Sequence, residues 1–106
     1  MGESPQISTH VLDTEVGAPA VGVAVDLYRM VGDIETRVGG GTTDDDGRIR
    51  SVLEGELQEG TYRIAFELHG PFFRQASVTF IVDDTSRSYH VPLLMAPYSL
   101  STYRGS

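Results

Sequence analysis

The chain has no cysteine among its 106 residues. This absence excludes a disulfide scaffold, a thiolate nucleophile and a cysteine-based metal site. Lysine is also missing, because all eight basic residues are arginines, and with fifteen acidic residues the formal net charge is −7. No stretch of the sequence concentrates positive charge. The composition therefore argues against binding to nucleic acid or to an anionic membrane surface.

Long hydrophobic runs are missing as well. No run approaches the roughly 20 apolar residues that a membrane-spanning helix needs. The opening residues, MGESPQIS, show neither the charged region nor the apolar region of a signal peptide. We therefore expect a soluble, cytoplasmic protein. With 40% hydrophobic residues the chain can bury one modest core, so we expect a single domain over residues 1–106.

No window of the sequence shows a helical pattern, and an alternation of period two is present instead. Every second residue from Val21 to Leu27 is apolar, and β-branched and aromatic residues dominate SVTFIV and SYHVPLL. Gly, Pro and Asp interrupt these segments at short intervals. The expected strands span residues 7–13, 21–31, 34–43, 48–53, 61–69, 76–82, 87–95 and 99–105. Short strands with frequent turns predict an all-β antiparallel sandwich or small barrel.

Three histidines are the side chains that can change charge near neutral pH. Alternation places His10 on the face opposite to that of its core-type neighbours Thr9 and Val11. His90 is set apart from Tyr89 and Val91 in the same way. The ordinary interpretation of each is a surface-facing histidine on a half-buried strand; the alternative is a catalytic imidazole. His69 stands at a strand end before a turn, where the ordinary interpretation is stronger.

The segment GTTDDDGRIR predicts a tight turn followed by an arginine. An aspartate of the run 44–46 can hydrogen-bond its own backbone, and Gly47 can adopt a positive φ. Arg48 and Arg50 then begin the next strand on the same face. An arginine fixed just after a rigid turn is well placed to bind a carboxylate or a planar anion through two parallel hydrogen bonds. The alternatives are a solvated arginine and a metal-binding loop. The metal-binding loop is disfavoured, because the flanking helices and terminal Glu of an EF-hand are missing.

Four segments are similar, in order and over nearly the whole chain, to the transthyretin-like 5-hydroxyisourate hydrolases. They read STHVLDTEVGAPAVGVAVDLYRM, GTTDDDGRI, GTYRIAFEL and YHVPLLMAPYSLSTYRGS. The terminal YRGS is the most specific of these elements. It is similar to the signature that separates the hydrolases from transthyretin itself, the hormone carrier.

The resemblance implies a sandwich of two four-stranded sheets. It also implies a homotetramer, a dimer of dimers with active sites at the dimer–dimer interface. The reaction is hydrolysis of 5-hydroxyisourate, the product of urate oxidation, which opens the six-membered ring on the way to allantoin in purine degradation. The resemblance implies no metal or organic cofactor. Family members carry a short helix before the strand expected at 76–82; this chain has only HGPFFRQA there, so we expect that helix to be missing.

The resemblance also implies the site residues, position by position. Those that match are His10, Arg48, His90 and the terminal Tyr103, Arg104, Gly105 and Ser106.

In the implied mechanism one histidine, His10 or His90, takes a proton from the attacking water. The other histidine orients the water or protonates the leaving nitrogen, and the sequence does not rank the two. Arg48 binds the planar anionic substrate and stabilises charge that develops on the carbonyl oxygen. Tyr103 binds substrate, and Ser106 completes the catalytic set with its hydroxyl.

Two other functions fit parts of the sequence. A transthyretin-type carrier would use the same channel for binding a small ligand without chemistry, and the missing helix favours it slightly. A purely structural module would also use the Asp-Gly turn, which is sound turn chemistry in any sandwich. The YRGS end together with two histidines favours the hydrolase over both.

Overall fold

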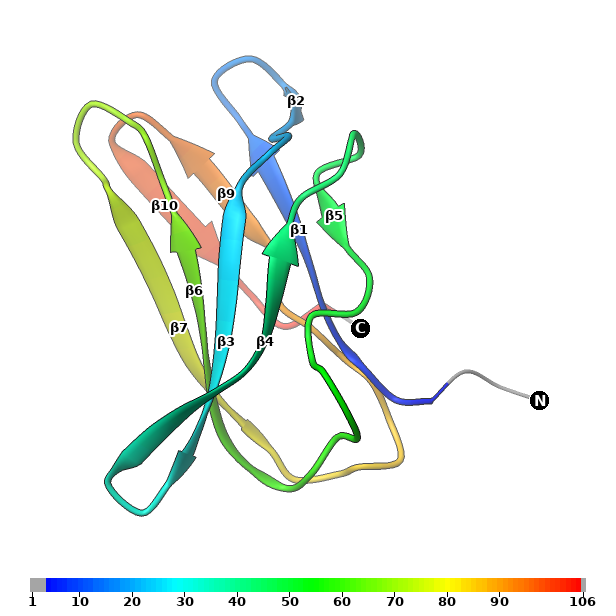
Figure 1. Cartoon of the computed structure of the whole chain (residues 1–106). Helices are drawn as coiled ribbons and strands as arrows, with labels where there is room; N and C mark the ends of the chain where they lie inside the picture. Colours follow the sequence, from blue (N-terminus) through cyan, green and yellow to red (C-terminus); the bar gives the residue numbers. More distant parts are fainter. Residues whose placement is uncertain (1–3, 106) are drawn as a thin grey trace.

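The computed structural model describes residues 4–105, which form ten strands in two facing sheets and no helix (Figure 1). One sheet has four antiparallel strands in the order β4-β3-β6-β7. Their bounds are β3 Ala24–Val31, β4 Ile34–Thr42, β6 Gly60–Glu67 and β7 Gln75–Val82. These four strands carry the alternating apolar pattern of the sequence. The predicted all-β sandwich is confirmed.

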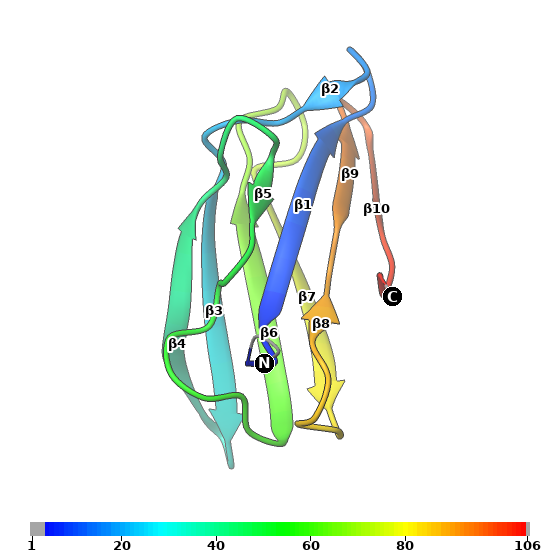
Figure 2. The same cartoon turned by 90° about the vertical axis from the view of Figure 1, so that its right-hand side faces the viewer.

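The second sheet is built around β1 and has six short strands where four were expected (Figure 2). Strands β2 and β5 pair antiparallel with β1, whereas β8 and β9 pair parallel with it, and β10 pairs antiparallel with β9. The bounds are β1 Ile7–Asp13, β2 Ala18–Pro19, β5 Arg48–Ile49, β8 Tyr89–His90, β9 Leu93–Ala96 and β10 Ser99–Thr102.

Pro92 explains why one expected strand is divided. The single strand expected at 87–95 is interrupted between β8 and β9, at Val91 and Pro92. Proline has no backbone N–H to donate to a ladder, so it sits where a strand ends or shifts its pairing. The short strand β2 lies between two expected strands and was not predicted. The remaining differences are strand ends, such as the start of β3 at Ala24 rather than at 21.

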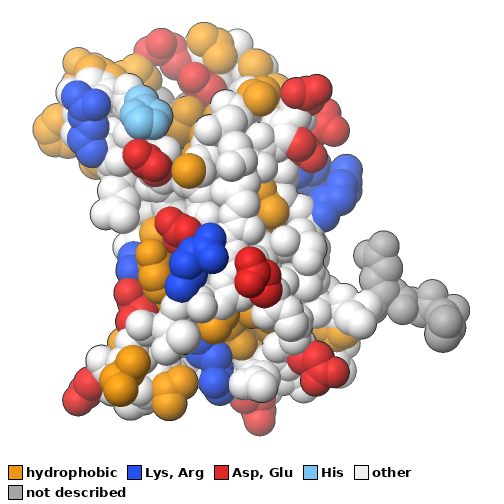
Figure 3. Space-filling view, viewed as in Figure 1, with side chains coloured by type: hydrophobic (Ala, Val, Ile, Leu, Met, Phe, Trp, Pro, Cys, Tyr) orange, Lys and Arg blue, Asp and Glu red, His pale blue; other side chains and the backbone are white. Residues whose placement is uncertain are grey.

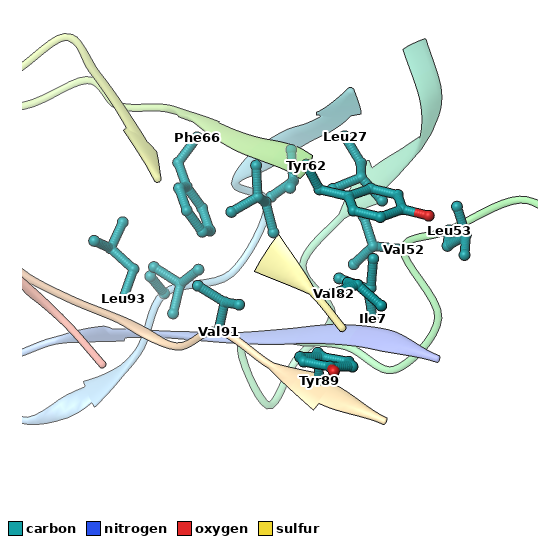
Figure 4. Close-up of a cluster of buried hydrophobic side chains, with 14 of the residues drawn as sticks. Ile7, Leu27, Val52, Leu53, Tyr62, Phe66, Val82, Tyr89, Val91 and Leu93 are labelled. Carbon is teal, nitrogen blue, oxygen red and sulfur yellow. The ribbon is translucent and has the colours of Figure 1, made fainter. Parts of the chain in front are cut away.

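The hydrophobic core lies between the two sheets (Figure 4). Leu27, Ile64 and Phe66 from the four-stranded sheet are fully buried against Ile7 and Leu93 from the second sheet. Each of these residues occupies the inward position of an alternating strand. Burial of a side chain of this size contributes roughly 1.5–3 kcal/mol to folding.

The alternation in β1 determines which side chains remain outside. Ile7, Thr9 and Val11 are buried, whereas Ser8 and His10 are only partly buried. The side chain of His10 therefore lies on the outer face of the second sheet, as predicted.

The connection between β6 and β7 contains no helix, so the expected loss of the family's helix is confirmed. Residues 68–74 form a short loop, which is closed by a hydrogen bond from the Leu68 N–H to the Arg74 carbonyl at 3.0 Å. Within residues 4–105 no helix is available that could cross a membrane. On the face seen in Figure 3, acidic side chains are spread among arginines and do not gather into one patch.

Candidate active site

The Asp44–Gly47 turn fixes the position of Arg48. The Asp44 carboxylate accepts hydrogen bonds from the backbone N–H groups of Asp46, at 2.9 Å, and of Arg48, at 3.0 Å. These bonds hold the pKa of the Asp44 carboxyl below its usual range. Gly47 has a φ of 74°, and a Cβ there would collide with the Val11 carbonyl. The predicted turn is confirmed.

The metal-binding alternative for this turn finds no support. The Asp44 side chain is engaged by the backbone of its own turn. Moreover, no three His, Asp or Glu side chains of residues 4–105 come together in a way that could hold a metal ion.

Strand register brings the two predicted histidines and the arginine to one surface. In the antiparallel pair β1–β5, His10 lies opposite Arg48, and in the parallel pair β1–β8, Ser8 lies opposite His90. Directly paired residues share a face of the sheet, and so do residues two apart on one strand. The side chains of His10, Arg48 and His90 therefore gather on the outer face around β1, where Figure 2 shows β5 and β8 beside it.

The ring of His10 is oriented by the same turn. Its Nε2 lies 2.9 Å from the Asp46 carbonyl oxygen. A carbonyl oxygen only accepts, so Nε2 carries the proton and, in the neutral ring, Nδ1 is the free basic nitrogen. One four-residue turn thus sets the backbone of Arg48 and the tautomer of His10.

His90 is held from the other side of β1. Its Nδ1 lies 2.8 Å from the Ser8 hydroxyl, and its side chain is half-buried. Burial lowers the pKa of His90 below its usual 6.5, and the positive charges of Arg48 and His10 lower the pKa further. The imidazole of His90 is therefore neutral at pH 7 and available as a base.

The end of the chain packs directly against His90. The Gly105 N–H donates to the His90 carbonyl at 2.8 Å, and the two residues form an isolated antiparallel bridge. The guanidinium of Arg104 lies 4.6 Å from the centroid of the Tyr89 ring, a cation–π distance. Gly105 has room for no side chain, because a Cβ would overlap the His90 ring. The tail is therefore docked beside the histidine rather than free.

Two further residues, Tyr103 and Ser106, were predicted for the site. Tyr103 is 59% exposed and shares a groove of about 220 Å³ with His90, but that groove includes neither His10 nor Arg48. In a single chain Tyr103 thus lines a different hollow from Arg48, although both were expected to bind substrate. Ser106 lies outside the described residues.

A depression of about 490 Å³ opens over this outer face, and polar side chains alone line it. The lining residues are Ser8, Arg48, Arg87, Ser88 and His90.

Sequence reasoning missed the contributions of Ser8, Arg87 and Ser88 to this depression. Alternation could have found Ser8, which shares the face of His10, and Ser88, which shares the face of His90, whereas no local signal marks Arg87.

A second cavity, of about 480 Å³, lies at the other end of β1 near Asp13. Its lining is mainly apolar, with Phe73, Met95 and Leu100, and it also includes the exposed His69. His69 is thus remote from the outer-face cluster, as its ordinary interpretation predicted. Acid–base chemistry requires the convergent ionisable groups of the first depression, so we place the candidate active site there.

Comparison with known proteins shows which family the chain resembles. The model of the HIUase/Transthyretin family matches residues 7–105. The 5-hydroxyisourate hydrolase of Deinococcus radiodurans is 44% identical over an alignment of length 119, gaps included, which covers all of both chains. The 5-hydroxyisourate hydrolase 2 of Rhizobium meliloti is 40% identical over an alignment of length 121, gaps included, which again covers all of both chains.

Two solved structures share the fold. The 5-hydroxyisourate hydrolase of Klebsiella pneumoniae matches with a TM-score of 0.82 and 34% identity, over 94% of this chain and 98% of that one. Sea bream transthyretin in complex with thyroxine matches with a TM-score of 0.85 and 27% identity, over 93% of each chain. From the family match and the full-length relatives, the chain belongs to the HIUase/Transthyretin family.

Proposed function

We propose that this protein is a 5-hydroxyisourate hydrolase, which opens the six-membered ring of its substrate by attack of water in urate degradation. The observation that carries the proposal is the convergence of His10, Arg48 and His90 on one open face of the sheet. Full-length relatives named 5-hydroxyisourate hydrolase support it. Fold alone does not decide, because a thyroxine-binding transthyretin matches the chain as well as a hydrolase does.

The side chains suit hydrolysis better than carriage of a ligand. A carrier needs an apolar channel with a few polar groups, whereas this depression is lined by two guanidinium groups, an imidazole and hydroxyls. A neutral imidazole beside a fixed cation is the equipment of general-base catalysis on an anionic substrate. The carrier remains the alternative function.

In the proposed mechanism His90 is the general base. A water molecule attacks a ring carbonyl carbon, and Nε2 of His90 takes its proton while Nδ1–H of the same ring donates to the Ser8 hydroxyl oxygen. Arg48 binds the planar anion and stabilises the negative charge that forms on the carbonyl oxygen. The C–N bond then breaks, the nitrogen takes a proton and the carbonyl carbon becomes a carboxylate. His10, oriented by Asp46, supplies or relays that proton.

A direct assay tests the proposal. Urate oxidase generates 5-hydroxyisourate in the cuvette, and the decay of its absorbance is followed with and without the protein. We expect decay far faster than the spontaneous rate, in proportion to enzyme concentration. Decay at the spontaneous rate over a range of protein concentrations would leave the carrier function as the better one.

Gly105→Ala is expected to lower kcat about tenfold with little change in stability. The added Cβ would overlap the His90 ring and force it away from Ser8. Gly105 lies outside the hydrophobic core, so the free energy of unfolding should change by less than about 1 kcal/mol. Steady-state kinetics and thermal denaturation measure the two effects. Gly70→Ala is the matched control, since its Cβ makes only an ordinary contact far from the site.

We further propose a single domain over residues 1–106, a cytoplasmic location and a homotetramer in which neighbouring copies enclose the depression. The edges of the sandwich support assembly. β7 forms the edge of the four-stranded sheet, and its sequence QASVTFIV has neither charge nor proline. Such an edge offers unpaired backbone groups to a second copy. The depression itself lies open in a single chain, so a facing copy is needed to exclude water from it.

Ile81→Lys tests the assembly. Ile81 is 68% exposed on β7, so a lysine there leaves the core intact but places a charge on the proposed pairing edge. We expect light scattering to give a mass near four times the 11.5 kDa of one chain for the wild type and a smaller mass for the variant. Ile34→Lys, at an equally exposed isoleucine on the opposite edge strand β4, should remain tetrameric. Dissociation of both variants, or of neither, contradicts pairing through β7.

A further inference from the structure

We propose that Arg87 is a substrate-binding residue of this site, a second guanidinium that attracts the anionic substrate and holds the carboxylate that ring opening creates. The inference rests on the proposed hydrolase function. It concerns a residue of the loop between β7 and β8, which no motif of the sequence singled out.

Arg87 forms one wall of the depression whose other wall carries Arg48. The same depression of about 490 Å³ is lined by both arginines together with His90. Arg48 comes from β5 and Arg87 from the loop before β8, on opposite sides of β1 in the sheet. A planar anion seated over His90 therefore has a guanidinium available on either side.

The loop presents Arg87 from a defined backbone. The Tyr89 hydroxyl accepts hydrogen bonds from the backbone N–H of Asp83, at 3.2 Å, and of Asp84, at 3.0 Å. The Ser88 hydroxyl accepts one from the Gln6 backbone at 2.9 Å, which ties the loop to the start of the chain. The residues on both sides of Arg87 are thus fixed, and its side chain alone is free to reach a ligand.

The charges around the depression favour an anion. The ion pairs within residues 4–105 are Arg37–Asp26 and Arg63–Glu35, so neither Arg48 nor Arg87 is neutralised by a carboxylate partner there. Two carboxylates oppose this positive charge, Asp84 near Arg87 and Asp44 near Arg48, and both already accept hydrogen bonds from groups of their own loops. With a net charge of −7, the protein as a whole repels anions. Two arginines at one mouth create the local positive field that can overcome this repulsion.

The reaction explains why a second guanidinium is useful. Water oxygen bonds to the ring carbonyl carbon, the C–N bond breaks, and the released nitrogen takes a proton. The new carboxylic acid ionises at neutral pH, so one negative charge is added within the depression. A guanidinium binds a carboxylate through two parallel hydrogen bonds. Since Arg87 lies at the rim, it interacts with substrate and transition state alike and affects KM more than kcat.

The experiment compares Arg87→Glu and Arg87→Gln with the wild type, and uses Arg74→Glu as a control. Arg74 is exposed on the turn before β7, away from the depression, and its variant carries the same change in net charge. We expect KM to rise about tenfold in R87E and about threefold in R87Q, with kcat within about twofold of the wild type. The difference should shrink at about 1 M salt, where the Debye length is near 3 Å. R74E should match the wild type.

Equilibrium binding of urate, a stable planar anion, is measured in parallel by calorimetry and separates the two hypotheses. If the wild type shows no hydrolytic activity, the proposed function is overturned. The urate affinities of the wild type and R87E then test, without any kinetic data, whether Arg87 binds an anion. Weaker urate binding by R87E than by R74E supports the inference. Equal KM and equal urate affinity in R87E and R74E overturn the inference. Urate binding that is equally strong in the wild type and in R87E also overturns it.

Discussion

Replacement of His90 by Asn is expected to lower kcat by about 10²–10⁴-fold, the usual contribution of a general base. The asparagine side chain cannot take a proton from water, but its amide N–H can still donate a hydrogen bond to the Ser8 hydroxyl oxygen. His90 is half-buried on the outer face and lies outside the hydrophobic core, so the fold should be retained. The decay of 5-hydroxyisourate absorbance, corrected for the spontaneous rate, measures the effect.

His69→Asn serves as the control for this experiment, because His69 is exposed at the other end of the sandwich. It should keep wild-type kinetics. The His10→Asn variant should lose less activity than H90N, about 10–10²-fold in kcat. His10 orients the water or relays a proton, whereas His90 abstracts the proton from the attacking water. If H10N proves the more damaging variant, the two histidines exchange roles. If both variants keep full activity, neither is the base.

The pH profile gives an independent readout of the base. Burial and the neighbouring positive charges hold the pKa of His90 below 6.5. A base works in its neutral form, so kcat/KM should be level at neutral pH and fall only as the pH drops through this lowered pKa. The midpoint of the acid limb should therefore lie below pH 6.5. A midpoint above that value would exclude His90 as the group that titrates.

The sequence alone was sufficient to predict the parts of the site that depend on local geometry. Alternation along residues 7–13 placed His10 outside, and burial of Ile7, Thr9 and Val11 confirms it. The Asp-Gly turn could be predicted because its conformation depends on Asp44 and Gly47 themselves. Such features are decided by a few neighbouring residues, and no tertiary contact had to override them.

The remaining features depend on pairing between distant segments. The hydrogen bond between Ser8 and His90 joins residues 82 positions apart, and it requires β8 to run parallel to β1 in one register. The division of the second sheet into six short strands has the same origin, since β1 pairs with four partners along its length. The packing of Gly105 against His90 is equally nonlocal. Periodicity reports the face of a residue but not its partner.

Replacement of Arg48 by Gln is expected to lower kcat/KM by about 10²–10³-fold, the usual loss when a donor to a developing oxyanion is removed. Glutamine keeps a polar side chain opposite His10 in the β1–β5 pair but removes the charge. The same variant should also change the pKa of His90 in a predictable direction. Burial of the ring persists while the repulsion from Arg48 is lost, so the pKa of His90 should rise toward 6.5.

Titration of the His90 ring protons by NMR measures this second effect without reference to catalysis. Arg48→Lys is the matched variant: it keeps the positive charge, so the pKa of His90 should stay low, but it cannot form two parallel hydrogen bonds. We therefore expect R48K to retain the wild-type position of the acid limb with activity between those of R48Q and wild type. An unchanged or lower pKa of His90 in R48Q would show that the guanidinium and the imidazole are not electrostatically coupled. The outer-face cluster would then be a set of neighbours rather than one catalytic unit.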